Sequence, residues 1–156
     1  GIFLDTKSFN VRSGERTFEA AAFLRRLGAD TIEVKKLLQS DFANTVARYK
    51  IIQSAVPYRD EIAIATLSEP TSRVLASQAA DELLDVSGIE ASFVLAKSAN
   101  RVLISGRSLD SINVQVILEK LGGGGHITIA GAQLDDTTLE EADEQLKNAI
   151  DEILNQ

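Results

Sequence analysis

The sequence has 156 residues, 44% of them hydrophobic and 25% charged, a composition that excludes an intrinsically disordered chain and suits about one folded domain. Cysteine is absent and histidine occurs once, which excludes a disulfide framework and a thiolate metal site and argues against a complete transition-metal centre. The formal net charge of −7 disfavours binding to a long nucleic acid. Because the sequence contains no methionine, we expect it to be a piece of a longer protein.

The first third of the sequence predicts a short strand followed by helices. The continuous apolar run Ile2–Leu4 is typical of a strand buried on both faces, so we expect the segment Gly1–Phe9 to be the end of a strand that runs into a loop. Three helices are expected after it: one over residues 17–27 capped by Thr17, one from Asp30 with a capping box to Glu33, and one from Asp41 that ends before Pro57.

The residues after Pro57 predict an α/β arrangement. The expected strands lie over residues 62–65, 91–96 and 102–105, the last two as a hairpin, and a further short apolar stretch covers residues 127–134. The expected helices lie over residues 71–84 and 112–121 and from Thr138 onward, where apolar side chains at helical spacing form one stripe. We therefore place a domain boundary near Pro57, between a mainly helical part and an α/β part.

The negative charge is concentrated at the C-terminal end. Residues 135–156 carry one lysine against eight acidic side chains, whereas residues 91–134 carry four basic and two acidic side chains. The segment that contains most of the glycines is therefore locally positive, and an anionic ligand is compatible with it.

Four consecutive glycines, Gly122 to Gly125, are followed by the single histidine, His126. Ordering four glycines is costly in backbone entropy, so the run needs an explanation. One explanation is a helix end and a sharp turn, which needs one or two glycines. The other is a surface where backbone N–H groups approach an anion without a Cβ in the way, and we favour it because His126 can donate a hydrogen bond to a phosphate. No Gly-Lys-Ser/Thr follows, so the run is not a nucleotide P-loop.

Four other polar residues are candidates for the same site or for a metal. Arg107 and Ser108 follow a strand and offer a fork-shaped donor beside a hydroxyl, a pairing suited to phosphate, although Arg107 also fits a solvated hairpin end. Asn113 is a candidate that equally fits an ordinary helix N-terminus. Asp5, at a predicted strand end, is a candidate metal ligand that equally fits a turn.

Several strings in the sequence resemble the DHH-family phosphoesterases. Gly1–Phe9 is similar to the last motif of the DHH domain, and the resemblance continues through Arg16–Ala21 and Leu27–Asp30. Ile104–Ser108, Ile112–Gln115 and Gly122–His126 resemble the DHH-associated C-terminal domain, whose signature is Gly-Gly-Gly-His. Within the family, the sequence most resembles the membrane-anchored bacterial cyclic-di-AMP phosphodiesterases.

This resemblance implies a fold, a reaction and a set of site residues. Residues 1–57 would be the C-terminal end of the DHH domain with a linker helix, and residues 58–156 an α/β substrate-binding domain with a mixed sheet. The reaction implied is manganese-dependent hydrolysis of cyclic di-AMP to pApA, in a protein anchored in the cell membrane with this domain in the cytoplasm. The substrate-binding residues implied are Arg107, Ser108, Asn113, Gly123, Gly124, Gly125 and His126.

The resemblance places Asp5 alone as a matching metal-motif aspartate, with most ligands of the two metal ions in missing upstream residues. We therefore expect no catalytic residue in this chain and no turnover from it alone. Its expected partners are cyclic di-AMP or a short linear dinucleotide, no long nucleic acid, and a second copy in a homodimer. Two alternatives stay open: another DHH-family enzyme, such as an oligoribonuclease and pAp phosphatase or an exopolyphosphatase, and a non-catalytic module for nucleotide binding or dimerisation.

Overall fold

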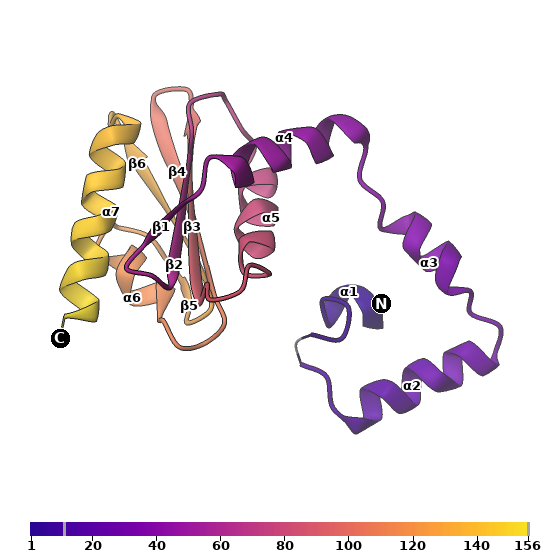
Figure 1. The fold of residues 1–156 in the computed structure, drawn as a ribbon. Helices are drawn as coiled ribbons and strands as arrows, with labels where there is room; N and C mark the ends of the chain where they lie inside the picture. Colours follow the sequence, from indigo (N-terminus) through magenta and orange to yellow (C-terminus); the bar gives the residue numbers. More distant parts are fainter. Residues whose placement is uncertain (11, 156) are drawn as a thin grey trace. The chain divides into compact units, whose positions relative to one another are not determined.

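The computed structural model describes residues 1–10 and 12–155, which form two compact units, Gly1–Ser40 and Asp41–Gln156. The first unit contains α1 (Ile2–Asp5), α2 (Glu15–Arg26) and α3 (Thr31–Leu37). The second contains α4 (Phe42–Gln53), β1 (Val56–Tyr58), β2 (Ile62–Leu67), α5 (Arg73–Leu83), β3 (Ala91–Ser98), β4 (Arg101–Ser108), α6 (Val114–Glu119), β5 (Gly124–His126), β6 (Ile129–Asp135) and α7 (Leu139–Leu154) (Figure 1).

The strand predicted at the start of the chain is wrong, because residues 2–5 form the helix α1. A strand needs a neighbouring strand to pair its backbone N–H and C=O groups, and none of the described residues of the first unit forms one. The backbone instead pairs locally: the N–H groups of Leu4 and Asp5 donate to the carbonyl of Gly1 at 3.0 and 3.1 Å.

The other helices begin close to the predicted positions. Asp30 accepts a hydrogen bond from the backbone N–H of Ile32 at the start of α3, and Asp41 accepts one from Asn44 at the start of α4. These caps satisfy N–H groups that the first helical turn leaves unpaired. The prediction that Thr17 caps α2 is wrong. The N-cap is Gly14, and Thr17 is the third residue of the helix, where its hydroxyl accepts a hydrogen bond from the N–H of Gly14.

The six strands form one mixed sheet in the order β1-β2-β3-β4-β6-β5. Strands β2 and β3 are parallel and are joined by α5, whereas the other neighbouring pairs are antiparallel. The predicted hairpin is confirmed as β3–β4, with Ser98 opposite Arg101. The α/β class and the mixed sheet expected from the sequence are thereby confirmed.

Helices cover the two faces of the sheet unequally (Figure 1). On one face, α6 and α7 bury a core that includes Phe93, Ile104 and Leu146. On the other face, α4 and α5 bury the smaller cluster around Val94 and Ala96. This second cluster draws its sheet residues from β2 and β3 only, so the same face of β4, β6 and β5 lies outside it.

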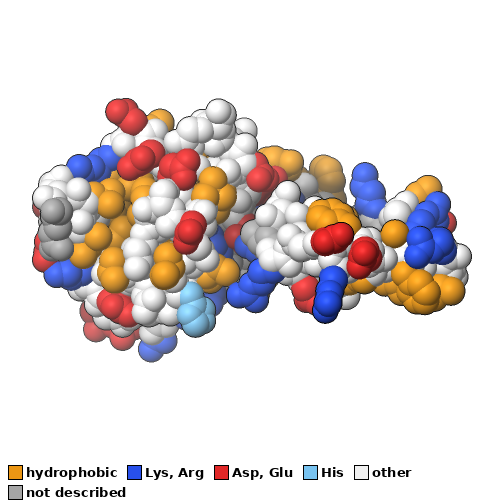
Figure 2. Space-filling model, turned by 90° about the horizontal axis from the view of Figure 1, so that it is seen from below, with side chains coloured by type: hydrophobic (Ala, Val, Ile, Leu, Met, Phe, Trp, Pro, Cys, Tyr) orange, Lys and Arg blue, Asp and Glu red, His pale blue; other side chains and the backbone are white. Residues whose placement is uncertain are grey.

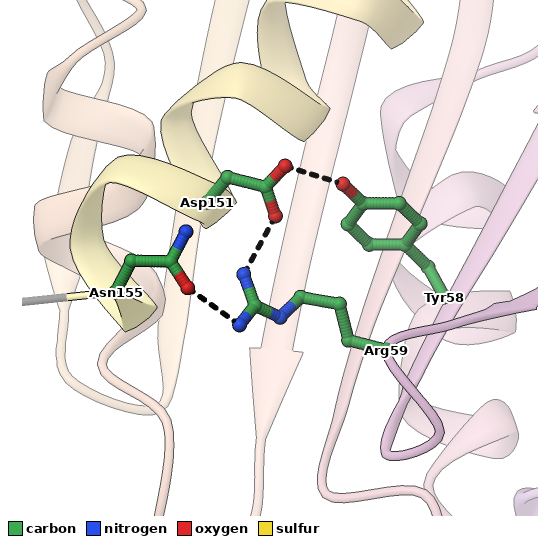
Figure 3. A network of polar contacts seen from close by, with 4 residues as sticks. All are labelled: Tyr58, Arg59, Asp151 and Asn155. Atoms are coloured by element: carbon green, nitrogen blue, oxygen red, sulfur yellow. Dashed lines mark hydrogen bonds and ion pairs between the residues drawn. The ribbon is translucent and has the colours of Figure 1, made fainter.

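A polar network joins the turn after β1 to α7 (Figure 3). The hydroxyl of Tyr58 donates to Oδ2 of Asp151 at 2.9 Å, and the Arg59 guanidinium bonds Oδ1 of Asp151 and the side-chain oxygen of Asn155, both at 2.7 Å. Thr138 is the N-cap of α7 and forms a capping box with Glu141, and the helix buries Ala142, Leu146, Ala149 and Ile150, which belong to the apolar stripe expected from Thr138 onward. Among the described residues, no helix is both long and apolar enough to cross a membrane.

Candidate functional site

A groove of about 490 Å³ lies on the part of the sheet that α5 leaves uncovered. Its floor is formed by β4, β6 and β5, and α5 forms one side. The glycine-rich segment that the sequence singled out therefore borders the groove. The lining residues are Arg73, Ser77, Leu103, Ile104, Ser105, Arg107, Gly122–Gly125, His126, Ile129–Ala132 and Gln133.

The strand register arranges the floor in rows that cross the sheet. Residues directly opposite one another on neighbouring strands share a face, so each row points its side chains to the same side. Arg107 lies opposite Ile129, which lies opposite His126. This row therefore presents two nitrogen-bearing side chains with an apolar side chain between them.

The next row of the floor is almost free of side chains. Ser105 lies opposite Gly131, and Gly131 lies opposite Gly124. A Cβ built on Gly124 would meet no atom within 4 Å, so that position faces open space. The row forms a shallow trough beside Arg107 and His126, in which a flat group or a backbone-bound anion finds no side-chain obstacle.

The glycines on either side of Gly124 serve the fold. Gly122 lies in the turn that follows α6, with a φ of +74°, and the N–H groups of Gly122 and Gly123 donate to the carbonyls of Glu119 and Leu118 at 3.1 and 2.9 Å. A Cβ on Gly123 would lie 2.3 Å from the carbonyl oxygen of Gly131, and one on Gly125 would lie 2.3 Å from that of Ile129. Both explanations offered by the sequence thus apply, each to different glycines of the run.

Arg107 is held in place by contacts on two sides. Its Nε lies 3.2 Å from Oδ1 of Asp81 on α5, an ion pair without hydrogen-bond alignment, and its Nη1 donates to the carbonyl of Gly106 at 2.8 Å. The side chain is only 12% exposed. A buried, fork-shaped donor held in one orientation is suited to bind a phosphate or carboxylate oxygen.

The groove is lined by basic side chains although the chain is acidic overall, and the carboxylate of Asp81 contacts one of them, Arg107. Its lining includes two arginines and the exposed His126 and contains no carboxylate, whereas the whole sequence carries a net charge of −7. The imidazole, the pale blue side chain in Figure 2, reaches the surface. A cleft lined by one sign of charge concentrates ions of the opposite sign, so this groove favours an anion.

Five of the seven predicted substrate-binding residues line this groove: Arg107, Gly123, Gly124, Gly125 and His126. Ser108 and Asn113 do not belong to its lining. The buried Ser108 hydroxyl points to the carbonyl of Ile127 at 3.4 Å, and the Asn113 side chain caps α6 by accepting from the N–H groups of Gln115 and Val116. A role in substrate binding stays a prediction for all seven residues.

Sequence reasoning did not propose the other lining residues for the site, among them Arg73, Ser77, Ser105, Gly131 and Gln133. Gly131 and Gln133 alternate with the buried Ala130 and Ala132 along β6, and this alternation is a signal that identifies the face they share. For Arg73 and Ser77 the sequence offers no such signal, because only the packing of α5 beside β4 brings them to the groove.

The metal-ligand candidate Asp5 lies in α1 of the first unit, whereas every lining residue of the groove belongs to the second unit. Within residues 1–10 and 12–155, no group of three His, Cys, Asp or Glu side chains is placed so that it could hold a metal ion. The residues described here therefore do not by themselves fit the metal site that the resemblance implies.

Comparison with known proteins gives a consistent result. The profile of the DHHA1 domain matches residues 59–156. Over 154 residues the chain is 49% identical to the "Cyclic-di-AMP phosphodiesterase PdeA" of Listeria monocytogenes, and over 153 residues it is 52% identical to the "Cyclic-di-AMP phosphodiesterase GdpP" of Geobacillus thermodenitrificans. These matches cover 97% and 96% of this chain but only 23% of either relative, so the chain spans about a quarter of their length.

A solved structure shares the fold of the chain. The crystal structure of an exopolyphosphatase-related protein from Bacteroides fragilis matches it with a TM-score of 0.86 at 18% sequence identity. The match covers 100% of this chain and 50% of that chain. At this level of identity the likeness concerns the fold alone.

Proposed function

Because the chain belongs to the DHHA1 domain family, we propose that it is the substrate-binding part of a phosphodiesterase that hydrolyses cyclic di-AMP to the linear dinucleotide pApA. Residues 1–57 are then the C-terminal end of the DHH domain with its linker helix, and residues 58–156 the DHHA1 domain. The observation that carries the proposal is the groove, whose lining includes two arginines and no carboxylate in an otherwise acidic chain, with Asp81 beside it holding one of those arginines. We take the identity of the substrate from the relatives at about 50% identity, which are named cyclic-di-AMP phosphodiesterases.

In this proposal the chain's own residues bind and orient the substrate. Arg107, already oriented by Asp81, and His126 hold phosphate oxygens from the two ends of one row of the floor. The trough formed by Ser105, Gly131 and Gly124 lets the ligand approach the sheet backbone closely. Holding the substrate in a fixed position is a contribution to catalysis that requires no reacting group in this chain.

The catalytic metal belongs to the whole enzyme, and we propose manganese for it. Asp5 is the one residue of this chain that we propose as a ligand, and further ligands must come from other parts of the protein, since the described residues gather no such cluster. We also propose that the whole protein is membrane-anchored with this domain in the cytoplasm, and that a homodimer forms. The chain alone is then expected to bind the dinucleotide without hydrolysing it.

Isothermal titration calorimetry of this chain with pApA tests the proposed function. We expect saturable binding, and we expect His126→Ala to weaken it about tenfold or more, because a hydrogen bond to a charged group is lost. Lys120→Ala is the matched control, since Lys120 is a cation outside the groove that pairs with Glu152 on α7. Absence of pApA binding, or an unchanged affinity in His126→Ala, would contradict the proposal.

A further inference from the structure

One side of α5 carries a polar stripe that faces the groove. Arg73, Ser77 and Asp81 are spaced four residues apart, so they lie on the same side of the helix one turn after another. Arg73 and Ser77 line the groove, and Asp81 contacts its arginine. The rest of α5 is apolar toward the sheet, with Ala76, Ala79, Ala80 and Leu83 buried.

Two contacts fix the register of this stripe along β4. The Ser77 hydroxyl lies 3.3 Å from the Ser105 hydroxyl, and Asp81 lies 3.2 Å from Arg107. The segment of α5 from Ser77 to Asp81 therefore runs alongside β4 from Ser105 to Arg107, in the same direction. Continued one turn in the opposite direction, the same register places Arg73 toward the end of the groove formed by Leu103 and Gln133.

The groove consequently has a basic side chain at each end. The backbone positions of Arg73 and Asp81 are about 12 Å apart along the helix axis, and Asp81 marks the position of Arg107. The trough formed by Ser105, Gly131 and Gly124 lies between the two ends. Unlike Arg107, Arg73 is exposed, and no described residue forms a hydrogen bond or an ion pair with its side chain.

We propose that Arg73 binds a second phosphate of the ligand, so that the groove selects molecules with two phosphates over those with one. This inference rests on the proposed function and assigns Arg73 as a specificity-determining residue within it. One phosphate lies at the row of Arg107 and His126, and the nucleoside that joins the two phosphates lies over the trough. A guanidinium offers a planar set of N–H donors that matches phosphate oxygens.

The inference is tested by measuring the affinity of pApA and of AMP for the same variants by calorimetry. We expect Arg73→Ala to lower the affinity for pApA about tenfold and to change that for AMP less than about twofold, since AMP has only one phosphate. Arg73→Lys is expected to restore part of the loss, because lysine keeps the charge without the fork. Arg101→Ala is the control, as Arg101 is an exposed arginine of the same strand β4 that pairs with Asp135 outside the groove.

The outcomes separate this inference from the proposed function. If Arg73→Ala leaves the affinity for pApA unchanged, or weakens pApA and AMP equally, the inference is overturned. If that result occurs while His126→Ala still weakens binding, the proposed function stands without it. If the unchanged chain fails to bind pApA, both are overturned. Circular dichroism of Arg73→Ala checks that this surface substitution leaves the fold intact.

Discussion

The four glycines from Gly122 to Gly125 differ in what surrounds the position where each would carry a side chain. Gly122 has a left-handed backbone conformation, and Gly123 and Gly125 leave no room for a Cβ beside β6. Gly124 has open space at that position, over the groove, and its φ lies outside the left-handed region that Gly122 occupies. The run therefore combines three structural glycines with one whose missing side chain keeps the floor clear.

This difference predicts opposite effects for two neighbouring alanine substitutions. Gly124→Ala should leave the melting temperature nearly unchanged and weaken pApA binding, because its methyl group enters the trough without touching the protein. Gly123→Ala should lower stability by about 1–3 kcal/mol, because its Cβ would lie 2.3 Å from the backbone oxygen of Gly131.

Thermal unfolding of each variant measures stability, and isothermal titration calorimetry with pApA measures binding. If Gly124→Ala destabilised the protein as much as Gly123→Ala, or if it bound pApA as well as the original chain, the division of roles among the glycines would be wrong. The two variants add the same methyl group at adjacent positions, so each serves as the control for the other.

Single residues of the site were predictable where their chemistry is local. The sequence identified Arg107, His126 and the glycine run, because a fork-shaped donor at a strand end and consecutive glycines are informative without knowledge of the fold. Arg73 and Asp81 were not identified. Their proximity to Arg107 depends on how α5 packs against β4, which no spacing in the sequence encodes.

At the scale of elements, the network between the turn after β1 and α7 makes stability depend on pH. The Arg59 guanidinium and the Tyr58 hydroxyl donate hydrogen bonds to the Asp151 carboxylate and hold the pKa of Asp151 below its ordinary value of 3.8, with Arg59 making the larger contribution (Figure 3). A carboxyl group with a lowered pKa in the folded state stabilises the protein above its unfolded pKa. This contribution is lost as the pH falls through the folded pKa.

We therefore expect the difference in melting temperature between the original chain and Asp151→Asn to shrink as the pH is lowered from about 6 to about 3. The amide of asparagine keeps the size of the side chain and does not titrate, so only the charge-dependent part is removed. Differential scanning calorimetry across this pH range measures the difference. A difference that stays constant with pH would contradict the role given to the Asp151 carboxylate.

Elements were predictable where the sequence carries its own start and stop signals. Asp41 and Thr138 mark helix starts, and the buried pattern of β2 to β4 marks strands, as predicted. The two edge strands β1 and β5 were missed, because Pro57 and consecutive glycines are poor strand formers and only pairing with β2 and β6 orders them. The strand predicted near Leu4 was wrong for the converse reason, since apolar composition alone provides no pairing partner.

At the scale of the whole molecule, the charged residues are distributed unevenly along the chain. Residues 135–156 account for an excess of seven negative charges, and six of their eight acidic side chains belong to α7, which packs on the sheet face opposite α5. The groove lies on the α5 side, where its lining residues include no carboxylate and Asp81 beside it contacts Arg107. An acidic chain can thus present a basic site, because most of these acidic side chains lie on α7, across the sheet from the groove.

The central claim, that the uncovered part of the sheet binds the phosphates of a dinucleotide, is tested most directly by nuclear magnetic resonance. The chain, labelled with ¹⁵N, is titrated with pApA, and the amide signals are followed. We predict that the largest shifts fall on Gly124, His126 and Arg107, while the amides of α7 hardly move. Shifts concentrated on α7, or no shifts at all, would contradict the account.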